Sequence, residues 1–575
     1  MKPYKVVICA LNSKYVHTAL APRCLLAGIE RDCDPASVEC KIVEGTVNEL
    51  PNDVLARIER ETPALLGLSC YIWNVTEMLS LANDYKSKHP NTRILLGGPE
   101  VSYRAEEFLR DHAEIDFILS GEGEETLPLL LRALTESAPL STVPSLSYRN
   151  ADGRIVCGEP YVGDGDPPDP YAGSDLSSLS GRIAYIESSR GCPYRCTFCL
   201  SGRLSAVRYF DMERVKADML HLAENNVRVI KFVDRTFNAD RDYAHALWRW
   251  IAESYGDTIP QGTRFHFEIA GERLDEASFS ILSRMPIGAV QLEVGLQSFH
   301  SETLRAIRRN PDTERLIANI QRLTALKNIH THIDLIAGLP KEDYETFVRG
   351  FDRAYRLGAN MLQMGFLKLL PGAPMTEDGK DKYECKYSKT PPYEVMETAS
   401  ITAEELDKLR LAADTLDRLG NSGRFRRTVR YLTESCGVSP YALFYGFGQY
   451  TRQNSVSVAL DAYTNAFAAY AITLPNVDQS RLLDCMVCDR LATNSSGVIP
   501  GSIRNFDKRL KRIRTILSAS PSTAETKGVR RTLAALRGRD AVVWADYKNP
   551  DPITGEYTLF ERPIRSVLIS DGAEP

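Results

Sequence analysis

Residues 187–199 read Glu-Ser-Ser-Arg-Gly-Cys-Pro-Tyr-Arg-Cys-Thr-Phe-Cys and place three cysteines within eight residues. They overlap the end of a strand-like apolar run, Ile183 to Ser188. Thiolates are soft ligands for iron, and one compact loop lets all three point at a single metal cluster. If the cluster has four irons, one is left without a protein ligand, and a substrate or cofactor can bind there. A zinc site would need a fourth Cys or His, and none lies near this loop in the sequence.

The sequence around this loop alternates between strands and helices. Six such units predict an open, partial βα barrel whose site faces the carboxyl ends of its strands. The predicted strands are Ile183 to Ser188, Val229 to Val233, Phe265 to Ile269, Val290 to Val294, His332 to Ala337 and Met361 to Leu369.

A second alternation precedes this one and predicts an N-terminal, doubly wound parallel sheet. Ligands of such sheets bind beyond the carboxyl ends of the strands. The predicted strands are Val6 to Ala10, Val38 to Val43, Leu65 to Ser69, Ile94 to Gly97 and Phe117 to Leu119. The loops to examine are therefore Leu11 to His17, Ser69 to Asn74, Gly97 to Val101 and Ser120 to Glu124.

Between the two alternations lies the acidic stretch Gly158 to Pro170, which is rich in Pro and Gly and predicts a linker. After about residue 397 helices dominate, beginning with the capping box Thr402-Ala-Glu-Glu405. We expect a Rossmann-like domain over 1–140, a linker over 141–180, a barrel over 181–395 and a mostly helical region of unknown role over 396–575.

Composition limits the class of protein. The chain has 575 residues, 43% of them apolar, and a net charge of −5, which favours several globular domains and makes nucleic acid an unlikely default partner. No apolar run approaches the ~20 residues that span a bilayer, and the N-terminus does not resemble a signal peptide. We therefore expect a cytoplasmic protein with no membrane partner, whose 13 cysteines are reduced thiols or metal ligands.

The spacing Cys192-x-x-x-Cys196-x-x-Cys199, with Phe198 before the last cysteine, resembles the signature of the radical S-adenosylmethionine superfamily. The resemblance implies that these cysteines hold a [4Fe–4S] cluster whose open iron is chelated by S-adenosylmethionine. Reductive cleavage of that cofactor would give a 5′-deoxyadenosyl radical. The resemblance also implies an external reductant such as flavodoxin or ferredoxin.

Three further segments are similar to motifs of the superfamily. Residues 293–298 resemble the fourth-strand motif that faces the ribose of S-adenosylmethionine, and 334–340 the fifth-strand motif near its adenine. Asp234 stands where the family contacts the amino group of the methionine moiety, but its surroundings depart from the usual Gly-Gly-Glu. The residues that the resemblance assigns to this cofactor are Phe198, Asp234, Glu293, Gln297, Ser298 and Gly338.

A doubly wound domain before such a barrel is similar to the arrangement of the cobalamin-binding branch of the superfamily. Glycines in its loops let the backbone approach a large flat corrin. No Asp-x-His-x-x-Gly occurs, so ligation of cobalt through that motif is not expected. The resemblance assigns to cobalamin the residues Ser13, Tyr15, His17, Ser69, Tyr71, Trp73, Gly97, Gly98, Pro99, Glu100, Gly121, Glu122, Gly123 and Glu124.

The function expected from these features is methylation of an unactivated carbon in a small-molecule or peptide substrate. Three alternatives stay open. They are a cobalamin enzyme that rearranges or cyclises without methylation, a methylthiotransferase-like enzyme with a second cluster on Cys9, Cys40 and Cys70, and a cobalamin-binding sensor. No catalytic acid or base can be named, although His266 becomes a candidate proton donor if it points into the barrel.

Overall fold

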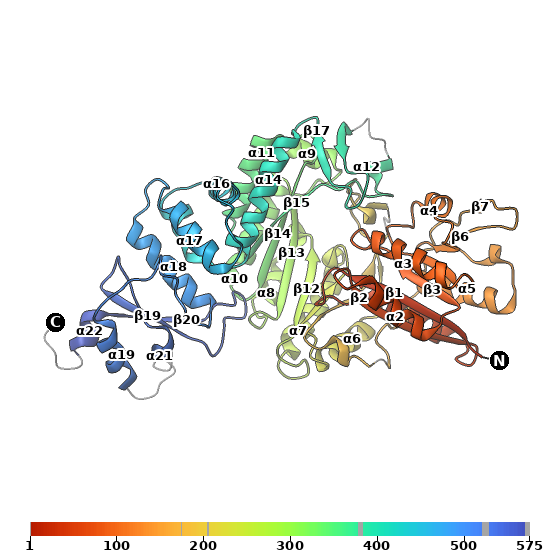
Figure 1. Cartoon of the computed structure of the whole chain (residues 1–575), viewed down its shortest axis with the longest axis horizontal. Helices are drawn as coiled ribbons and strands as arrows, with labels where there is room; N and C mark the ends of the chain where they lie inside the picture. The colour runs from red at the N-terminus through yellow and green to blue at the C-terminus, as the bar shows by residue number, and fades with distance from the viewer. Residues whose placement is uncertain (1, 174, 204–205, 378–382, 520–527, 570–575) are drawn as a thin grey trace. The chain divides into compact units, whose positions relative to one another are not determined.

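The structure is a computed structural model that describes residues 2–173, 175–203, 206–377, 383–519 and 528–569 (Figure 1). The chain divides into two compact units. The first comprises 1–293, 305–312 and 367–398, and the second 294–304, 313–366 and 399–575.

A seven-stranded sheet with the order β2-β1-β3-β4-β5-β6-β7 begins the first unit. Strands β1 to β5 are parallel, which confirms the predicted doubly wound sheet. Strands β6 and β7 add an antiparallel hairpin within the predicted linker range 141–180, where no strand is predicted from the sequence. The strands are β1 (Tyr4–Asn12), β2 (Val38–Thr46), β3 (Leu65–Ser69), β4 (Arg93–Gly97), β5 (Phe117–Leu119), β6 (Leu146–Arg149) and β7 (Ile155–Val156).

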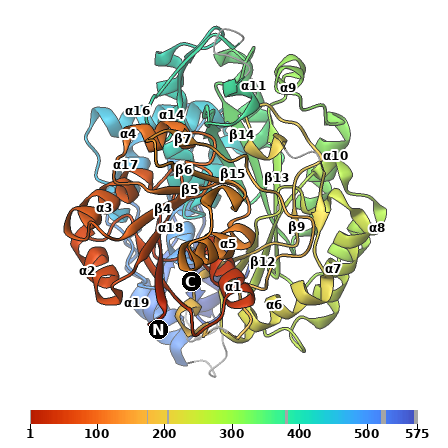
Figure 2. The same ribbon diagram turned by 90° about the vertical axis from the view of Figure 1, so that its right-hand side faces the viewer.

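Helices cover both faces of this sheet (Figure 2). Apolar residues of α1 (Leu20–Asp32) and α5 (Gly123–Glu136) share one core with the sheet, and those of α2 (Pro51–Glu61), α3 (Val75–Lys88) and α4 (Ala105–Asp111) share the other. Because both faces are covered, every residue of the inner strand β3 is buried. The strand order reverses between β1 and β3, and this switch point is where open α/β sheets bind ligands.

A second sheet has the strand order β15-β14-β13-β12-β11-β8, which is the six-stranded partial barrel expected from the sequence. The boundary between the two units falls within β13. Its strands are β8 (Ile183–Ile186), β11 (Val229–Phe232), β12 (Arg264–Ile269), β13 (Val290–Gln297), β14 (His330–Ala337) and β15 (Met361–Phe366).

Four of the helices between these strands are capped by aspartates. Asp211, Asp240, Asp275 and Asp343 each accept a hydrogen bond from the backbone N–H three residues later, which satisfies a donor that the helix itself cannot. The helices are α6 (Met212–Glu224), α7 (Arg241–Ser254), α8 (Glu276–Leu282), α9 (Ser301–Ala306), α10 (Thr313–Leu326) and α11 (Tyr344–Tyr355).

The C-terminal part of the second unit is mostly helical, as predicted, and the capping box of Thr402 and Glu405 opens its first helix. The helices are α14 (Ala403–Leu416), α15 (Arg426–Arg430), α16 (Pro440–Gln453), α17 (Leu460–Ala471), α18 (Gln479–Thr493), α19 (Leu510–Ala519), α21 (Val529–Thr532) and α22 (Ile564–Ile569).

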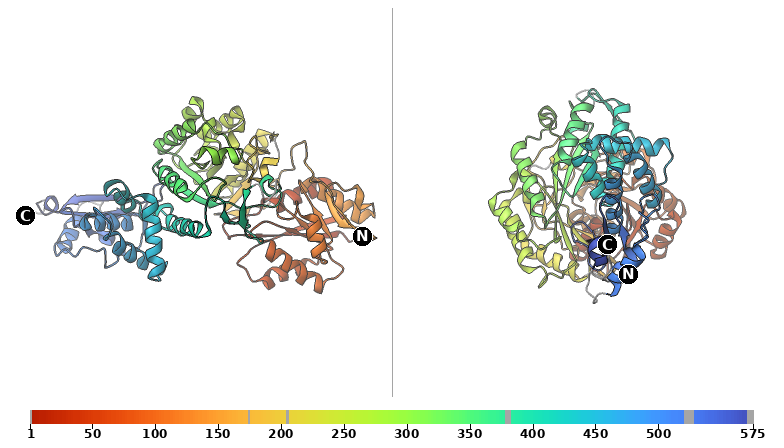
Figure 3. Two further views of the ribbon diagram at one scale, coloured as in Figure 1. Left: turned by 90° about the horizontal axis from the view of Figure 1, so that it is seen from above. Right: turned by 90° about the vertical axis from the view of Figure 1, so that its left-hand side faces the viewer.

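A small antiparallel sheet lies at the end of this region, in blue in Figure 3. It consists of β18 (Ala534–Ala535), β19 (Ala541–Asp546) and β20 (Thr558–Pro563). Trp544 of β19 and Ile513 of α19 lie in the core that joins the sheet to its helices. Within the described ranges, no helix combines the length and apolar character needed to cross a membrane.

Candidate active site

The three cysteines lie on the loop that follows β9 (Ser189–Arg190). Cys192 and Cys196 are buried, Cys199 is half-buried, and none forms a disulfide. Gly191 enters the loop at φ +105°, and a Cβ there would lie 2.0 Å from the carbonyl oxygen of Ala206. Only glycine fits this turn, in which the backbone just before Cys192 packs against the backbone at Ala206.

Two polar groups contact these sulfurs. Thr236 Oγ1 lies 3.5 Å from Cys192 Sγ, and Arg309 donates from Nη1 to Cys196 Sγ at 3.9 Å. Burial raises the pKa of Cys196, while the charge of Arg309 opposes that shift. The Thr197 amide donates to the Ile307 carbonyl at 3.1 Å, which fixes the middle of the loop. Three free thiols in one loop, one of them with a cationic N–H donor, fit an iron–sulfur cluster.

Asp234 follows β11 and is almost fully buried beside the start of the cysteine loop. Its carboxylate accepts hydrogen bonds from the amide and hydroxyl of Ser188, at 3.0 and 2.6 Å, and from the hydroxyl of Ser189, at 2.6 Å. Burial raises its pKa to about 6, while these hydrogen bonds oppose the shift. Asp234 therefore holds the segment that enters the loop, and its contact with S-adenosylmethionine stays a prediction.

A row of polar side chains crosses the inner face of the barrel. Tyr185, Lys231 and His266 are register partners on β8, β11 and β12. Lys231 lies 3.4 Å from a carboxylate oxygen of Glu293 and 3.5 Å from one of Glu268, and His266 Nε2 lies 2.9 Å from Glu293.

These contacts place His266 inside the barrel, the condition under which the sequence made it a candidate. Lys231 and Glu268 were missed, although the alternation Phe265-His-Phe-Glu-Ile carries the signal, since every second residue of a buried strand is polar. The row can donate and accept protons and bind polar substrate groups.

In the second unit, β13 ends at Gln297, whose backbone has φ +68°. Its Oε1 is buried and has no hydrogen-bond partner among the described residues. The neighbouring Ser298 hydroxyl donates to Glu342 Oε1 at 2.6 Å, and Glu342 Oε2 is also buried without a partner in the part of the chain described. Burial raises the pKa of Glu342 to about 7. Backbone strain beside orphaned polar atoms is typical of a ligand site, which fits this predicted S-adenosylmethionine segment.

Glu342 was not singled out from the sequence, although it follows the fifth-strand motif directly. Gly338 of that motif adopts φ +82°, so the chain turns sharply between β14 and Glu342. Phe198, the aromatic residue of the cysteine loop, is half-buried in the first unit.

The loops assigned to cobalamin flank the switch point of the first sheet. The exposed ring of Trp73 stacks on Tyr71, with ring centroids 4.4 Å apart and an interplanar angle of 12°. Trp73 Nε1 donates to the Leu11 carbonyl at 3.2 Å, which fixes the ring between the loops after β1 and β3. An anchored pair of stacked rings, with Trp73 exposed and Tyr71 half-buried, fits a flat apolar ligand such as a corrin.

Two glycines of these loops are required by close backbone approach. A Cβ on Gly98 would lie 2.4 Å from the Cys70 carbonyl oxygen, and one on Gly121 would lie 2.1 Å from that of Tyr161. Both residues also adopt positive φ, +110° and +88°. The glycines therefore bring each loop against a neighbouring segment of the protein.

The other residues assigned to cobalamin differ in how far they are exposed to solvent. Ser13 and Tyr15 are exposed, and Ser69 is buried. His17 Nδ1 lies 2.6 Å from the Tyr185 hydroxyl on β8. Gly97, Pro99 and Gly123 are half-buried.

The carboxylates in these loops are bound to other protein groups. Glu100 accepts a hydrogen bond from the Tyr393 hydroxyl, and both Glu122 and Glu124 pair with Arg190. Tyr393 and Arg190 could not be recognised from the sequence as neighbours of these loops, because the partners are distant in the chain.

The cysteines of the alternative second cluster lie on different faces of the sheet. Cys9 and Cys70 belong to the core beneath α2 and α3, whereas Cys40 packs against the opposite core beneath α1 and α5. Burial also raises the pKa of Cys9 to about 12. These three thiols cannot bind one cluster, so the second-cluster alternative has no support in this domain.

Comparison with known families agrees with this geometry. Residues 186–354 match the radical SAM superfamily, and residues 8–131 match the B12 binding domain. The chain belongs to the cobalamin-binding branch of the radical S-adenosylmethionine superfamily. In this cobalamin-binding radical SAM protein, residues 381–531 match a further family, described as a protein of unknown function (DUF4080).

Two curated relatives of this radical SAM protein are methyltransferases. One is the cobalamin-dependent radical SAM methyltransferase TokK of Streptomyces tokunonensis, 28% identical over 424 residues that cover 68% of this chain and 60% of TokK. The other is the 2-(S-pantetheinyl)-carbapenam-3-carboxylate methyltransferase of Streptantibioticus cattleyicolor, 30% identical over 55% of this chain and 49% of that protein. The chain thus spans less than two thirds of either relative.

Solved structures share the fold of this cobalamin-binding radical SAM protein. The methyltransferase TsrM of Kitasatospora setae, solved with cobalamin and a [4Fe–4S] cluster, has a TM-score of 0.56 at 20% identity, covering 68% of this chain and 76% of TsrM. OxsB, solved with aqua-cobalamin and S-adenosylmethionine, has a TM-score of 0.59 at 15% identity, covering 84% of this chain and 78% of OxsB.

Proposed function

We propose that the chain is a cobalamin-dependent radical S-adenosylmethionine methyltransferase that methylates an unactivated carbon. The observation that carries the proposal is one unit that contains both a loop of three free thiols and a doubly wound sheet with a stacked aromatic pair at its switch point. The names of TokK and of the carbapenam methyltransferase support methyl transfer as the reaction.

The residues of the chain have separate tasks in this proposal. Cys192, Cys196 and Cys199 bind three irons, and Trp73 with Tyr71 supports the corrin face. When bound, the cluster supplies the electron that cleaves S-adenosylmethionine, and the corrin supplies the methyl group.

The inner row of the barrel orients the substrate through side chains that are held in place by hydrogen bonds and ion pairs to one another. The His266 ring donates to or accepts from Glu293 through Nε2, and Lys231 stays protonated between two carboxylates. Because these charges are already paired, they present directional hydrogen bonds rather than a net field to a bound molecule.

The proposal includes partners and a location. A low-potential electron donor such as flavodoxin or ferredoxin reduces the cluster, and the substrate is a small molecule or a peptide. A cytoplasmic location, where the cysteines stay reduced, suits this chemistry.

The test is anaerobic purification and cluster reconstitution, followed by measurement of iron and cobalt per chain and of the visible spectrum. We expect about four irons per chain and stoichiometric corrin absorbance. With S-adenosylmethionine labelled in its methyl group and a reductant, we expect 5′-deoxyadenosine and, once a substrate is found, labelled product.

The matched variants are Cys192→Ala/Cys196→Ala/Cys199→Ala, which should lose all iron, and Cys157→Ala, which removes an exposed thiol outside the loop and should lose none. Iron well above four per chain without corrin would reject the cobalamin assignment. An unlabelled product would instead favour rearrangement or cyclisation without methyl transfer.

A further inference from the structure

Arg190 joins the two loops that the proposed function assigns to different cofactors. It lies two residues before Cys192, and its Nη1 pairs with Glu122, at 2.7 Å, and with Glu124. Both glutamates belong to the loop after β5, at the start of α5. On its other side the same guanidinium binds Glu187, with Nε at 3.0 Å and Nη2 at 2.7 Å.

A second arginine repeats part of this arrangement. Arg208 on β10 (Arg208–Tyr209) is the register partner of Arg190, and its Nη2 also binds Glu122 at 2.7 Å. Both guanidinium groups lie over the buried ring of Phe210, at 5.7 and 5.6 Å from its centroid. Both arginines therefore contact the same aromatic ring and the same acidic side chain, Glu122.

The five charged side chains of this cluster are mostly buried. The exposed fractions are 17% for Arg190, 18% for Arg208 and only 6% for Glu124. Desolvating such groups offsets much of their mutual attraction, so the pairs add little net stability. What they fix is geometry, because a forked guanidinium binds carboxylates in restricted directions.

Among the residues described, the backbone of the acidic loop is not bound to the cysteine loop. Its backbone is tied elsewhere, since the Glu122 amide donates to the Tyr161 carbonyl at 3.0 Å. Gly121 packs against the same residue so closely that a Cβ would clash. The side chains around Arg190 are thus the contacts described that join the two loops directly.

We propose that Arg190 is a positioning residue that clamps the strand entering the cysteine loop to the acidic loop of the first sheet, so that corrin binding and the properties of the cluster depend on each other. The inference rests on the proposed function for the identity of the two ligands. Coupling of this kind is reciprocal in free energy, so a change in either loop alters binding at the other.

The test uses the full-length chain with Arg190→Gln, Glu124→Gln and the double variant. Each single change should weaken binding of hydroxocobalamin, followed by visible absorption, by about 5- to 150-fold, the usual range of coupling between sites. Each should also shift the midpoint potential of the cluster, followed by electron paramagnetic resonance. Because the two residues act as one contact, the double variant should change no more than the stronger single variant.

Arg31→Gln is the matched control. Arg31 of α1 is exposed and pairs with Glu125, which is the neighbour of Glu124 on α5. It should leave affinity and potential at parental values. Arg190→Lys keeps the charge and loses the fork, so it should recover part of both. Hydrogen exchange of residues 189–199 should quicken in Glu124→Gln although that residue is remote in sequence.

Additive effects in the double variant, or parental exchange and potential in Glu124→Gln, would overturn the clamp. Failure of the parent to bind hydroxocobalamin would reject the proposed function instead. The exchange of residues 189–199 would still decide the clamp in that case, because it reports contacts between protein groups alone.

Discussion

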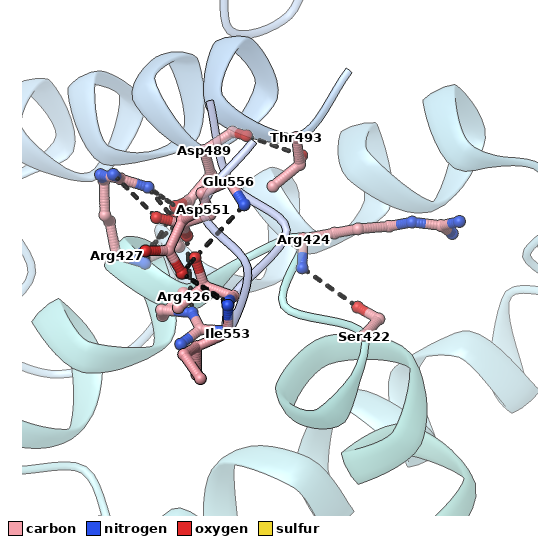
Figure 4. A network of polar contacts seen from close by, with 11 residues as sticks. Ser422, Arg424, Arg426, Arg427, Asp489, Thr493, Asp551, Ile553 and Glu556 are labelled. Carbon is pink, nitrogen blue, oxygen red and sulfur yellow. Dashed lines mark hydrogen bonds and ion pairs between the residues drawn. The ribbon is translucent and has the colours of Figure 1, made fainter. Parts of the chain in front are cut away.

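Two buried ion-pair networks of similar composition lie in different units of this chain. One surrounds Arg190 in the first unit. The other surrounds Asp489 of α18 in the second unit, where Arg427 bridges Asp489, at 3.4 Å, and Glu556, at 3.1 Å (Figure 4). Both networks join segments that are far apart in the sequence, yet they differ in what satisfies the carboxylates.

Backbone donors decide the difference. Asp489 accepts the amides of Arg427 and Thr428, both at 2.9 Å, and the Thr428 hydroxyl at 2.7 Å. It therefore caps α15 from outside the helix, and Arg424 nearby points away from the network in Figure 4. The carboxylates around Arg190 are paired by arginine side chains. The network around Asp489 stabilises a fold, whereas the network around Arg190 sets the relation between two loops.

The largest effect that separates the two networks is expected from Asp489→Ala. It leaves two buried amides and a hydroxyl without their acceptor and removes one of the two carboxylates that pair with Arg427, so the free energy of unfolding should fall by about 3–5 kcal/mol. Urea unfolding of the full chain measures this. Thr493→Ser, which keeps the hydroxyl that donates to the Asp489 carbonyl, is a mild control on the same helix. Weaker hydroxocobalamin binding in Asp489→Ala, comparable to that of Arg190→Gln, would remove the contrast between the networks.

The pH dependence of stability sharpens the comparison with a smaller effect. Burial raises the pKa of Asp489 to about 6, while the amides of Arg427 and Thr428 oppose the shift. An unfolded aspartate titrates near 4, so the folded state binds the extra proton between these values. The free energy of unfolding should therefore fall as pH rises from about 4 to 6, by up to about 1.4 kcal/mol per unit from this group, and stay level above.

Asp489→Asn isolates this contribution. Its unfolding free energy, measured in urea at several pH values, should lack the part of the slope that the parent shows between pH 4 and 6. Equal slopes in the two proteins would mean that Asp489 stays ionised throughout that range.

The smallest expected effect concerns Arg309, whose N–H contacts Cys196 Sγ. Removing a cation and a hydrogen bond from a cluster ligand makes reduction harder, so Arg309→Gln should lower the midpoint potential by several tens of millivolts, where about 59 mV is a tenfold change for one electron. Redox titration followed by electron paramagnetic resonance measures the shift. Arg308→Gln makes the same charge change at an exposed neighbouring residue and should shift the potential much less.

The sequence predicted those parts of the molecule whose signal is local. Three cysteines in one loop indicate an iron–sulfur cluster without further information. Short apolar runs that alternate with helical segments located the strands of both sheets. Trp73 and Gly98 were found because they follow predicted strands. The hairpin of β6 and β7 was missed because its strands are short and border a segment rich in Pro and Gly.

Other parts depend on contacts between distant residues. Arg190 meets Glu122 and Glu124 only in the folded first unit, and its position beside the cysteine motif gives no hint of these partners. In the sequence, nothing distinguishes Asp489 from the other polar residues of its helix. In the structure it is 1% exposed and accepts hydrogen bonds from the start of α15. Pairing of this kind is set by tertiary structure and carries no periodic signal in the chain.

The placement of the cysteines in the first unit also bears on how the protein behaves towards thiol reagents. Cys9, Cys24 and Cys70 are fully enclosed and burial raises the pKa of each, so they hold no thiolate near neutral pH. Cys157, at the end of β7, is the exposed cysteine of the thirteen, all of which lie in the described ranges. A mild alkylating label should therefore react there first once the cysteine loop is occupied by its metal, giving a spectroscopic reporter on the first unit without any substitution.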